Sequence, residues 1–217
     1  QFGANVADNC IRTWFFVRDV DTHYAGLVQA RKEWFTRHGL TENTHYIAST
    51  GIGGGPADTK ALVQLGAYAL QGFEPAQVCY LHAPQWLNAT HEYGVTFERG
   101  TAVEYGDRAH VIISGTASID HLGQVVYPGD IVGQTKRMWA NVEALLGEAS
   151  ASMDDMMHII VYLRDMADYE VVRSLFAERF PQTPTVITLA PVCRPAWLIE
   201  MECIAVVPRK NASFRNF

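Results

Sequence analysis

The sequence lacks the features that would mark a secreted or membrane protein. No apolar run is long enough to cross a bilayer. The chain begins Gln1-Phe2-Gly3, without the basic and apolar regions of a secretion signal. Its four cysteines are too far apart for a Cys-x-x-Cys pair or a disulfide framework (Cys10, Cys79, Cys193, Cys203). We therefore expect a protein of the reducing cytoplasm that has no membrane partner.

Positive charge is also scarce. The chain has 17 Lys and Arg against 23 Asp and Glu, a formal net charge of −6 at pH 7. Binding to nucleic acid needs a basic face that neutralises phosphates. We therefore expect no nucleic-acid partner, and a nuclease is disfavoured. A small anionic metabolite is compatible with this charge, because one or two well-placed arginines are enough to hold it.

Two suggestive patterns are incomplete. The glycine-rich stretch 51–55 lacks the Gly-Lys-Ser/Thr that completes a phosphate-binding loop, and it favours a flexible turn. The histidines, among them His82, His91, His110 and His121, show no metal-ligand spacing. We therefore expect neither a metal ion nor a cofactor.

What the sequence does have is a globular composition and an internal repeat. Of its 217 residues, 48% are hydrophobic and 18% are charged, as in folded proteins. The segment Trp14–Asp19 matches Ile160–Asp165, an offset of 146 residues. Each copy predicts a strand, an Arg-Asp turn and then a helix with apolar residues at helical spacing. Chance similarity is the alternative, but the matching turns and helix ends favour duplication.

The second copy has an upstream half that the first copy lacks. Residues 111–114 predict a strand, and residues 124–127 predict its hairpin partner. Residues 130–146 predict a helix that Asp130 caps at its start and Gly147 at its end. With the second strand-helix unit and two closing strands, the complete copy is expected to be an α+β domain of order β-β-α-β-α-β-β.

The closing strands are expected at 185–189 and 196–207, and those of the first copy at 45–49 and 61–70. The predicted organisation is a partial copy over 1–71, a connector over 72–108 and a complete domain over 109–217. Because Gln1 aligns with Gly147, we expect the native protein to extend upstream by about 50 residues.

Several motifs of the second copy resemble the Rid (YjgF-like) family. They are Ile113-Ser114-Gly115, Asp130, Gln134-Thr135, Asn141, the strand Val161–Met166 and the ending Ile199–Glu202. The resemblance covers about the last hundred residues. It implies the Rid fold, usually a trimer with pockets between neighbouring sheets, and in many members hydrolysis of enamines or imines. Those deaminases hold the substrate carboxylate with a Pro-x-Arg motif, where this chain has Pro184-Thr185.

The chain also resembles the chorismatases, which carry two Rid-like copies and hydrolyse chorismate. The matching features are the run Ile113–Ile119, Gly129-Asp130 with Gln134-Thr135, Tyr93-Gly94 to Phe97-x-Arg99, and Cys193-Arg194 with Glu200 seven residues after the Cys. The resemblance places Tyr93, Phe97, Gly115, Thr116 and Cys193 at the substrate. One departure is that Val95-Thr96 stand where a Pro-Arg follows the Tyr-Gly of chorismatases.

Glu200 is the candidate catalytic residue. An enol ether hydrolyses when an acid protonates its terminal methylene carbon, after which water adds. Glu200 lies in the apolar segment 197–201, where burial would raise its pKa and keep it protonated. The alternative is an exposed pair with Glu202, because alternate residues share one face of a strand. Arg194 and Arg99 are candidate clamps for the substrate's carboxylates.

These patterns together favour a hydrolase that acts on chorismate or a similar small anionic enol compound. Two alternatives stay open: a Rid-type enamine or imine deaminase, and a non-catalytic metabolite-binding protein. We expect a homo-oligomer, most simply a trimer formed by the complete copy, because a partial copy leaves sheet edges exposed.

Overall fold

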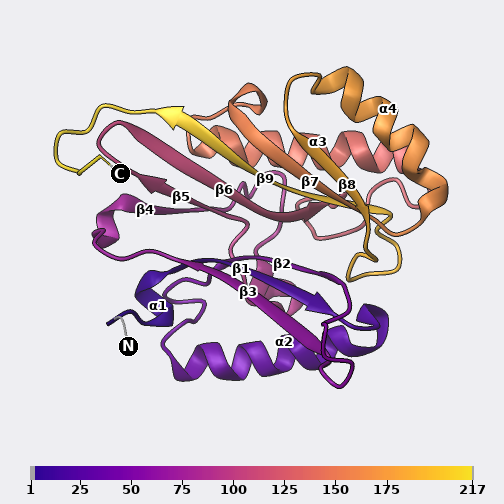
Figure 1. Ribbon diagram of the computed structural model, residues 1–217, viewed down its shortest axis with the longest axis horizontal. Coiled ribbons are helices and arrows are strands. Elements are labelled where there is room, and N and C mark those ends of the chain that lie inside the picture. Colours follow the sequence, from indigo (N-terminus) through magenta and orange to yellow (C-terminus); the bar gives the residue numbers. More distant parts are fainter. Residues whose placement is uncertain (1–2, 217) are drawn as a thin grey trace.

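The computed structural model describes residues 3–216, apart from the side chain of Tyr93, and within them the strands form two sheets (Figure 1). The smaller sheet has the order β2-β1-β3. Its strands are β1 (Cys10–Val17), β2 (Ala48–Gly53) and β3 (Val63–Ala69), and its helices are α1 (Val6–Asn9) and α2 (Val20–Arg37). Figure 1 shows that this sheet lies between α2 and the larger sheet.

The larger sheet has the order β4-β5-β6-β9-β7-β8. Its strands are β4 (Val78–Leu81), β5 (Gly100–Glu104), β6 (Arg108–Ala117), β7 (Met156–Leu163), β8 (Thr185–Leu189) and β9 (Ile199–Pro208). Helices α3 (Ile131–Glu148) and α4 (Tyr169–Arg179) cover the face that points away from the smaller sheet (Figure 1). The connections hold the 3-10 helices η1 (Pro75–Gln77), η2 (Thr90–Tyr93), η3 (Met153–Asp155) and η4 (Met166–Asp168). No helix within residues 3–216 is long and apolar enough to cross a membrane.

Helix α3 forms where the sequence predicts it. The Asp130 side chain accepts a hydrogen bond from the backbone N–H of Gly133 at 3.0 Å, the bond expected of an N-cap. Met138 and Val142 on its apolar side are fully buried in the main core, which also contains residues of β6, β7, β9 and α4. The helix ends at Glu148, two residues beyond the predicted end.

Strand pairing confirms the internal repeat. Strand β1 is parallel to β2 and antiparallel to β3, as β7 is parallel to β8 and antiparallel to β9. Val17 pairs with Val63 across β1 and β3. Leu163, 146 residues after Val17, pairs with Ile199 at the corresponding point. The chain therefore has a partial copy followed by a complete one, although β2 begins three residues and ends four residues later than predicted.

The opening hairpin of the complete copy was predicted wrongly. Residues 111–114 belong to β6 as expected, but β6 pairs with β5 on one side and with β9 on the other, which leaves no edge for residues 124–127. The latter segment keeps only an isolated bridge between Ile119 and Val125 within the described residues. Tyr127 has a left-handed backbone with φ of 59°, and the following proline has no N–H to donate, so the strand cannot continue there.

The segment expected to be a connector contributes to the fold. Strands β4 and β5 both lie within 72–108, and they form one edge of the larger sheet. The end of this segment also joins the two sheets. The Glu98 N–H donates to the Ile47 carbonyl at 3.1 Å, and the Ser49 N–H donates to the Ser114 hydroxyl at 2.9 Å. Strand β2 is therefore fixed beside β6, and a cavity lies at this junction.

Candidate active site

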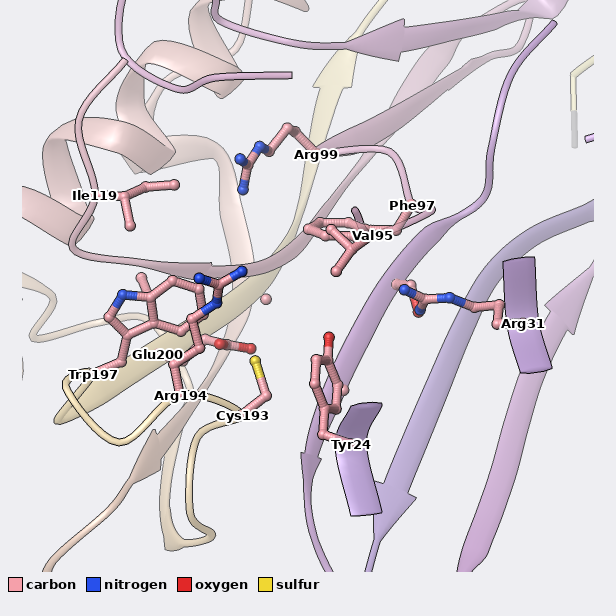
Figure 2. A pocket seen from close by; sticks show the side chains of 14 residues that line it. Tyr24, Arg31, Val95, Phe97, Arg99, Ile119, Cys193, Arg194, Trp197 and Glu200 are labelled. Carbon is pink, nitrogen blue, oxygen red and sulfur yellow. The ribbon is translucent and has the colours of Figure 1, made fainter. Parts of the chain in front are cut away.

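A cavity lies where the partial copy meets the complete copy (Figure 2). Helix α2 and strand β2 form one wall, and β6, β9 and the segment before β9 form the other. The segment before β5 closes the space between them. The lining residues are Tyr24, Arg31, Ser49, Gly51, Val95, Phe97, Arg99, Gly115, Ala117, Ile119, Cys193, Arg194, Trp197 and Glu200.

Glu200 reaches the cavity from β9 and is 4% exposed. Burial, followed by the nearby charge of Glu202, raises its pKa to about 8, while the guanidinium groups of Arg12 and Arg99 act in the opposite direction. The carboxyl group therefore carries a proton at neutral pH. Glu202 is equally buried, so the alternative of an exposed pair is wrong.

Gly115 leaves the room that Glu200 occupies. A Cβ atom on Gly115 would lie 2.0 Å from Oε1 of Glu200, far inside van der Waals contact. The Gly115 N–H donates to Oγ1 of Thr50 at 2.9 Å, which fixes this part of β6 to β2. Thr116, which the sequence places at the substrate, does not line the cavity, and its hydroxyl donates to the Ser114 carbonyl at 2.9 Å. Gly115 and Ala117 line the cavity and Thr116 between them does not, because successive strand residues point to opposite faces.

Arg99 and Arg194 both reach the cavity, as the sequence predicts. Arg99 is buried, and its Nη2 donates to the backbone carbonyl of Asn88 at 2.9 Å and to the Asn88 side chain at 3.1 Å. The guanidinium of Arg194 lies 5.3 Å from the ring of Trp197. In Figure 2 both guanidinium groups point into the cavity. Phe97 also lines the cavity, whereas the side chain of Tyr93 lies outside the described residues.

Sequence reasoning missed the residues that the partial copy contributes. Arg31 of α2 is buried, and its Nε donates to the Thr96 hydroxyl at 3.1 Å. One signal was available: at the repeat offset of 145, Arg31 aligns with Phe176, a core residue of α4. A charged residue at an apolar position of the repeat indicates a special role. The Val95-Thr96 departure thus lies at the site, because Val95 lines the cavity and Thr96 holds Arg31.

Cys193 and Tyr24 lie together near Glu200. Burial, and next the charge of Glu200, raise the pKa of the Cys193 thiol to about 12. Burial also raises the pKa of Tyr24 well above its usual range, and the neighbouring Cys193 adds to this rise. Both groups are therefore neutral at physiological pH. Cys193 lines the cavity, and its raised pKa does not suit a nucleophile.

The cavity combines one protonated acid with the positive charges of Arg31, Arg99 and Arg194, a set suited to an anionic ligand. Its aromatic walls, Phe97 and Trp197, suit an organic ring. Within residues 3–216, no group of three or more His, Cys, Asp or Glu side chains is arranged to hold a metal ion.

Comparisons with known proteins match the complete copy. The family model described as endoribonuclease L-PSP matches residues 100–207. A RutC family protein of Pyrococcus abyssi is 35% identical over 97 residues, which are 44% of this chain and 76% of that protein. The 3-aminoacrylate deaminase RutC of Acinetobacter baylyi is 31% identical over 99 residues, which are 45% of this chain and 79% of that protein.

A solved structure matches both copies. The crystal structure of a chorismatase superposes with a TM-score of 0.78 over 90% of this chain, at 23% sequence identity. The matched region is 63% of the length of that chorismatase. At this level of identity the similarity shows a common fold, and it extends over both the partial and the complete copy of this chain.

Proposed function

This chain belongs to the Rid family, and from that premise we propose that it is a hydrolase that releases pyruvate from chorismate or a similar small anionic enol ether. The observation that carries the proposal is the buried Glu200, whose pKa near 8 keeps it protonated, in a cavity that also holds Arg31, Arg99 and Arg194. A proton donor beside several cations is suited to an anionic substrate that must be protonated to react.

In the proposed reaction, Glu200 gives its proton to the terminal methylene carbon of the enol ether. The O–H bond of Glu200 breaks while a C–H bond forms, and the ether carbon becomes an oxocarbenium ion. Water adds to this carbon, and the proton that the water loses restores Glu200. The resulting hemiketal collapses: the bond between its carbon and the ring oxygen breaks, the proton of its hydroxyl group passes to the ring oxygen, and the products are pyruvate and a ring alcohol.

The arginines divide between the two ends of such a substrate. Arg194 precedes Glu200 by six residues, and we assign it to the carboxylate of the enolpyruvyl group, which must lie beside the acid. Arg31 and Arg99 are assigned to the ring carboxylate. Phe97 is 5.4 Å from the guanidinium of Arg99, so a ring bound there would have an aromatic neighbour.

A second candidate is the hydrolysis of an enamine. The similarity to a 3-aminoacrylate deaminase favours it, and an enamine is also protonated at carbon, so Glu200 could serve both reactions. Neither Thr185 nor Val186, the two residues that follow Pro184, is an arginine, and neither lines the cavity. Ser49 corresponds to Thr185 in the partial copy, because Ser49 pairs with β1 as Thr185 pairs with β7, and Ser49 does line the cavity. The carboxylate clamp of the deaminases therefore has no direct counterpart, which favours the first candidate.

The test compares two substrates with two readouts. The protein is incubated with chorismate, and pyruvate is followed through NADH consumption by lactate dehydrogenase. A parallel incubation with 2-aminoacrylate measures the rate of ammonia release and compares it with the rate without protein. Ammonia is the readout here because pyruvate is a product of both reactions. Pyruvate release from chorismate, without accelerated ammonia release from 2-aminoacrylate, supports the proposal. Accelerated ammonia release without pyruvate from chorismate would point to the deaminase, and neither activity would leave a metabolite-binding protein.

A further inference from the structure

A second buried carboxylate lies two residues beyond Glu200 on the same face of β9. Glu202 is 4% exposed, and both of its oxygens have donors from the partial copy. Its Oε2 accepts from Nη2 of Arg12 at 2.7 Å and from the hydroxyl of Thr50, and its Oε1 accepts from Nε1 of Trp14 at 2.8 Å. Glu202 therefore forms a buried ion pair with Arg12 and accepts two further hydrogen bonds.

Thr50 connects this carboxylate with the place of Glu200. Its hydroxyl donates to Glu202 and accepts from the backbone N–H of Gly115. Gly115 is the residue whose missing side chain leaves room for Glu200. Glu202 and the backbone of β6 at Gly115 are therefore joined through Thr50, beside the space that Glu200 occupies.

We propose that Glu202 is a positioning residue for the proton of Glu200: a fixed negative charge, held by Arg12, Trp14 and Thr50, that retains the proton on Glu200 until the substrate accepts it. The inference rests on the proposed function, because it takes Glu200 as the acid. It gives the partial copy a second role: α2 and β2 form one wall of the cavity, and β1 and β2 supply the residues that hold this charge.

The other groups around Glu200 do not supply this charge. Tyr24 of α2, Tyr162 of β7 and Cys193 all have pKa values raised chiefly by burial, so they are neutral at physiological pH. Arg12 of β1, Arg31 of α2, Arg99 and Arg194 are cations, and cations favour loss of the proton from Glu200. Among these groups, Glu202 is the one that favours its retention.

The test is a pH titration of the protein without substrate. Protein with ¹³C-labelled glutamate carboxyl groups is followed by NMR, and the Glu200 signal is assigned by its loss in Glu200→Gln. In Glu202→Gln we expect the midpoint of Glu200 to fall by about one pH unit or more, because an adjacent negative charge is removed and Arg12 is left uncompensated. Glu178→Gln, an exposed position on α4, is the matched control and should leave the midpoint unchanged.

A double variant covers a possible folding defect in Glu202→Gln. Arg12→Met/Glu202→Gln removes both charges of the buried pair, a change that is often neutral for stability. The charge of Glu202 shifts the pKa of Glu200 more than the charge of Arg12 does. In the double variant the titration midpoint of Glu200 should therefore also fall, but by less than in Glu202→Gln. An unchanged Glu200 midpoint in either folded variant would overturn the inference.

The titration separates this inference from the proposed function, because it needs no turnover. If the wild type releases no pyruvate but Glu202→Gln still lowers the midpoint, the hydrolase proposal fails and the role of Glu202 stands. If pyruvate is released, the fall in rate at high pH should move to lower pH by the same amount as the midpoint. A merely structural role would instead lower the rate at every pH without moving the profile.

Discussion

A Cβ atom on Gly115 would lie 2.0 Å from Oε1 of Glu200, so the carboxyl group fills the space that a side chain at position 115 would need. Gly115→Ala should displace the carboxyl group from its position in the cavity. We expect pyruvate release to fall by about a hundredfold or more, since general acid catalysis depends on placement of the acid. Steady-state assays of the purified variant give the measurement.

The matched control is Gly147→Ala, because a Cβ at this position of α3 meets no atom within 4 Å. This variant should retain full activity and gain up to about 1 kcal/mol in free energy of unfolding from the higher helix propensity of alanine. Equal activity of the two alanine variants would show that the close approach of Gly115 to Glu200 is unimportant.

Arg31 tests the contribution of the partial copy to substrate binding. Arg31→Met keeps much of the side-chain volume and removes the charge. The corresponding residue of α4, Phe176, is apolar, so an apolar side chain suits this position. We expect KM for chorismate to rise about tenfold to a hundredfold, the equivalent of one lost charge-assisted hydrogen bond. Arg37→Met, at the exposed end of the same helix, should leave KM unchanged. A KM for Arg31→Met within twofold of the wild type would exclude Arg31 from binding.

The raised pKa of Glu200 predicts how stability depends on pH. The folded protein holds the proton up to about pH 8, whereas the unfolded chain loses it near the ordinary value of 4.5. The wild type should therefore lose free energy of unfolding as pH rises from about 4.5 to 8, by an amount on the order of 4 kcal/mol. Glu200→Gln should lack this loss. Urea denaturation of both proteins at pH 5 and pH 8.5 measures the difference, and parallel pH dependences would contradict the assignment.

Much of this architecture could be predicted because the chain repeats itself. The offset between Trp14 and Ile160 predicted equivalent strands, and the register of β1 and β7 agrees with it. The apolar stripe and cap of α3 were also sufficient to locate that helix. The pattern of residue types did not show that the strand predicted at 124–127 is absent. The left-handed backbone at Tyr127 ends that segment.

The site was predictable only in part. Cys193, Arg194 and Glu200 are close in the sequence and fall within motifs, so they could be found together. Arg31 and Ser49 enter the cavity only because β2 docks against β6, and that contact joins residues 65 positions apart. Glu202 was recognised as a neighbour of Glu200, but its ion pair with Arg12 spans 190 residues and has no local signal.

The measurement that bears most directly on Glu200 is pyruvate release from chorismate by the wild type, Glu200→Gln and Glu178→Gln, each assayed between pH 6 and pH 9. The wild type and Glu178→Gln should be active below about pH 8 and lose rate above it, as Glu200 gives up its proton. Glu200→Gln keeps the size of the side chain but has no acidic proton, so its rate should be lower by about a hundredfold to ten-thousandfold while chorismate still binds. Pyruvate release by Glu200→Gln at the wild-type rate would contradict the role of Glu200 as the proton donor.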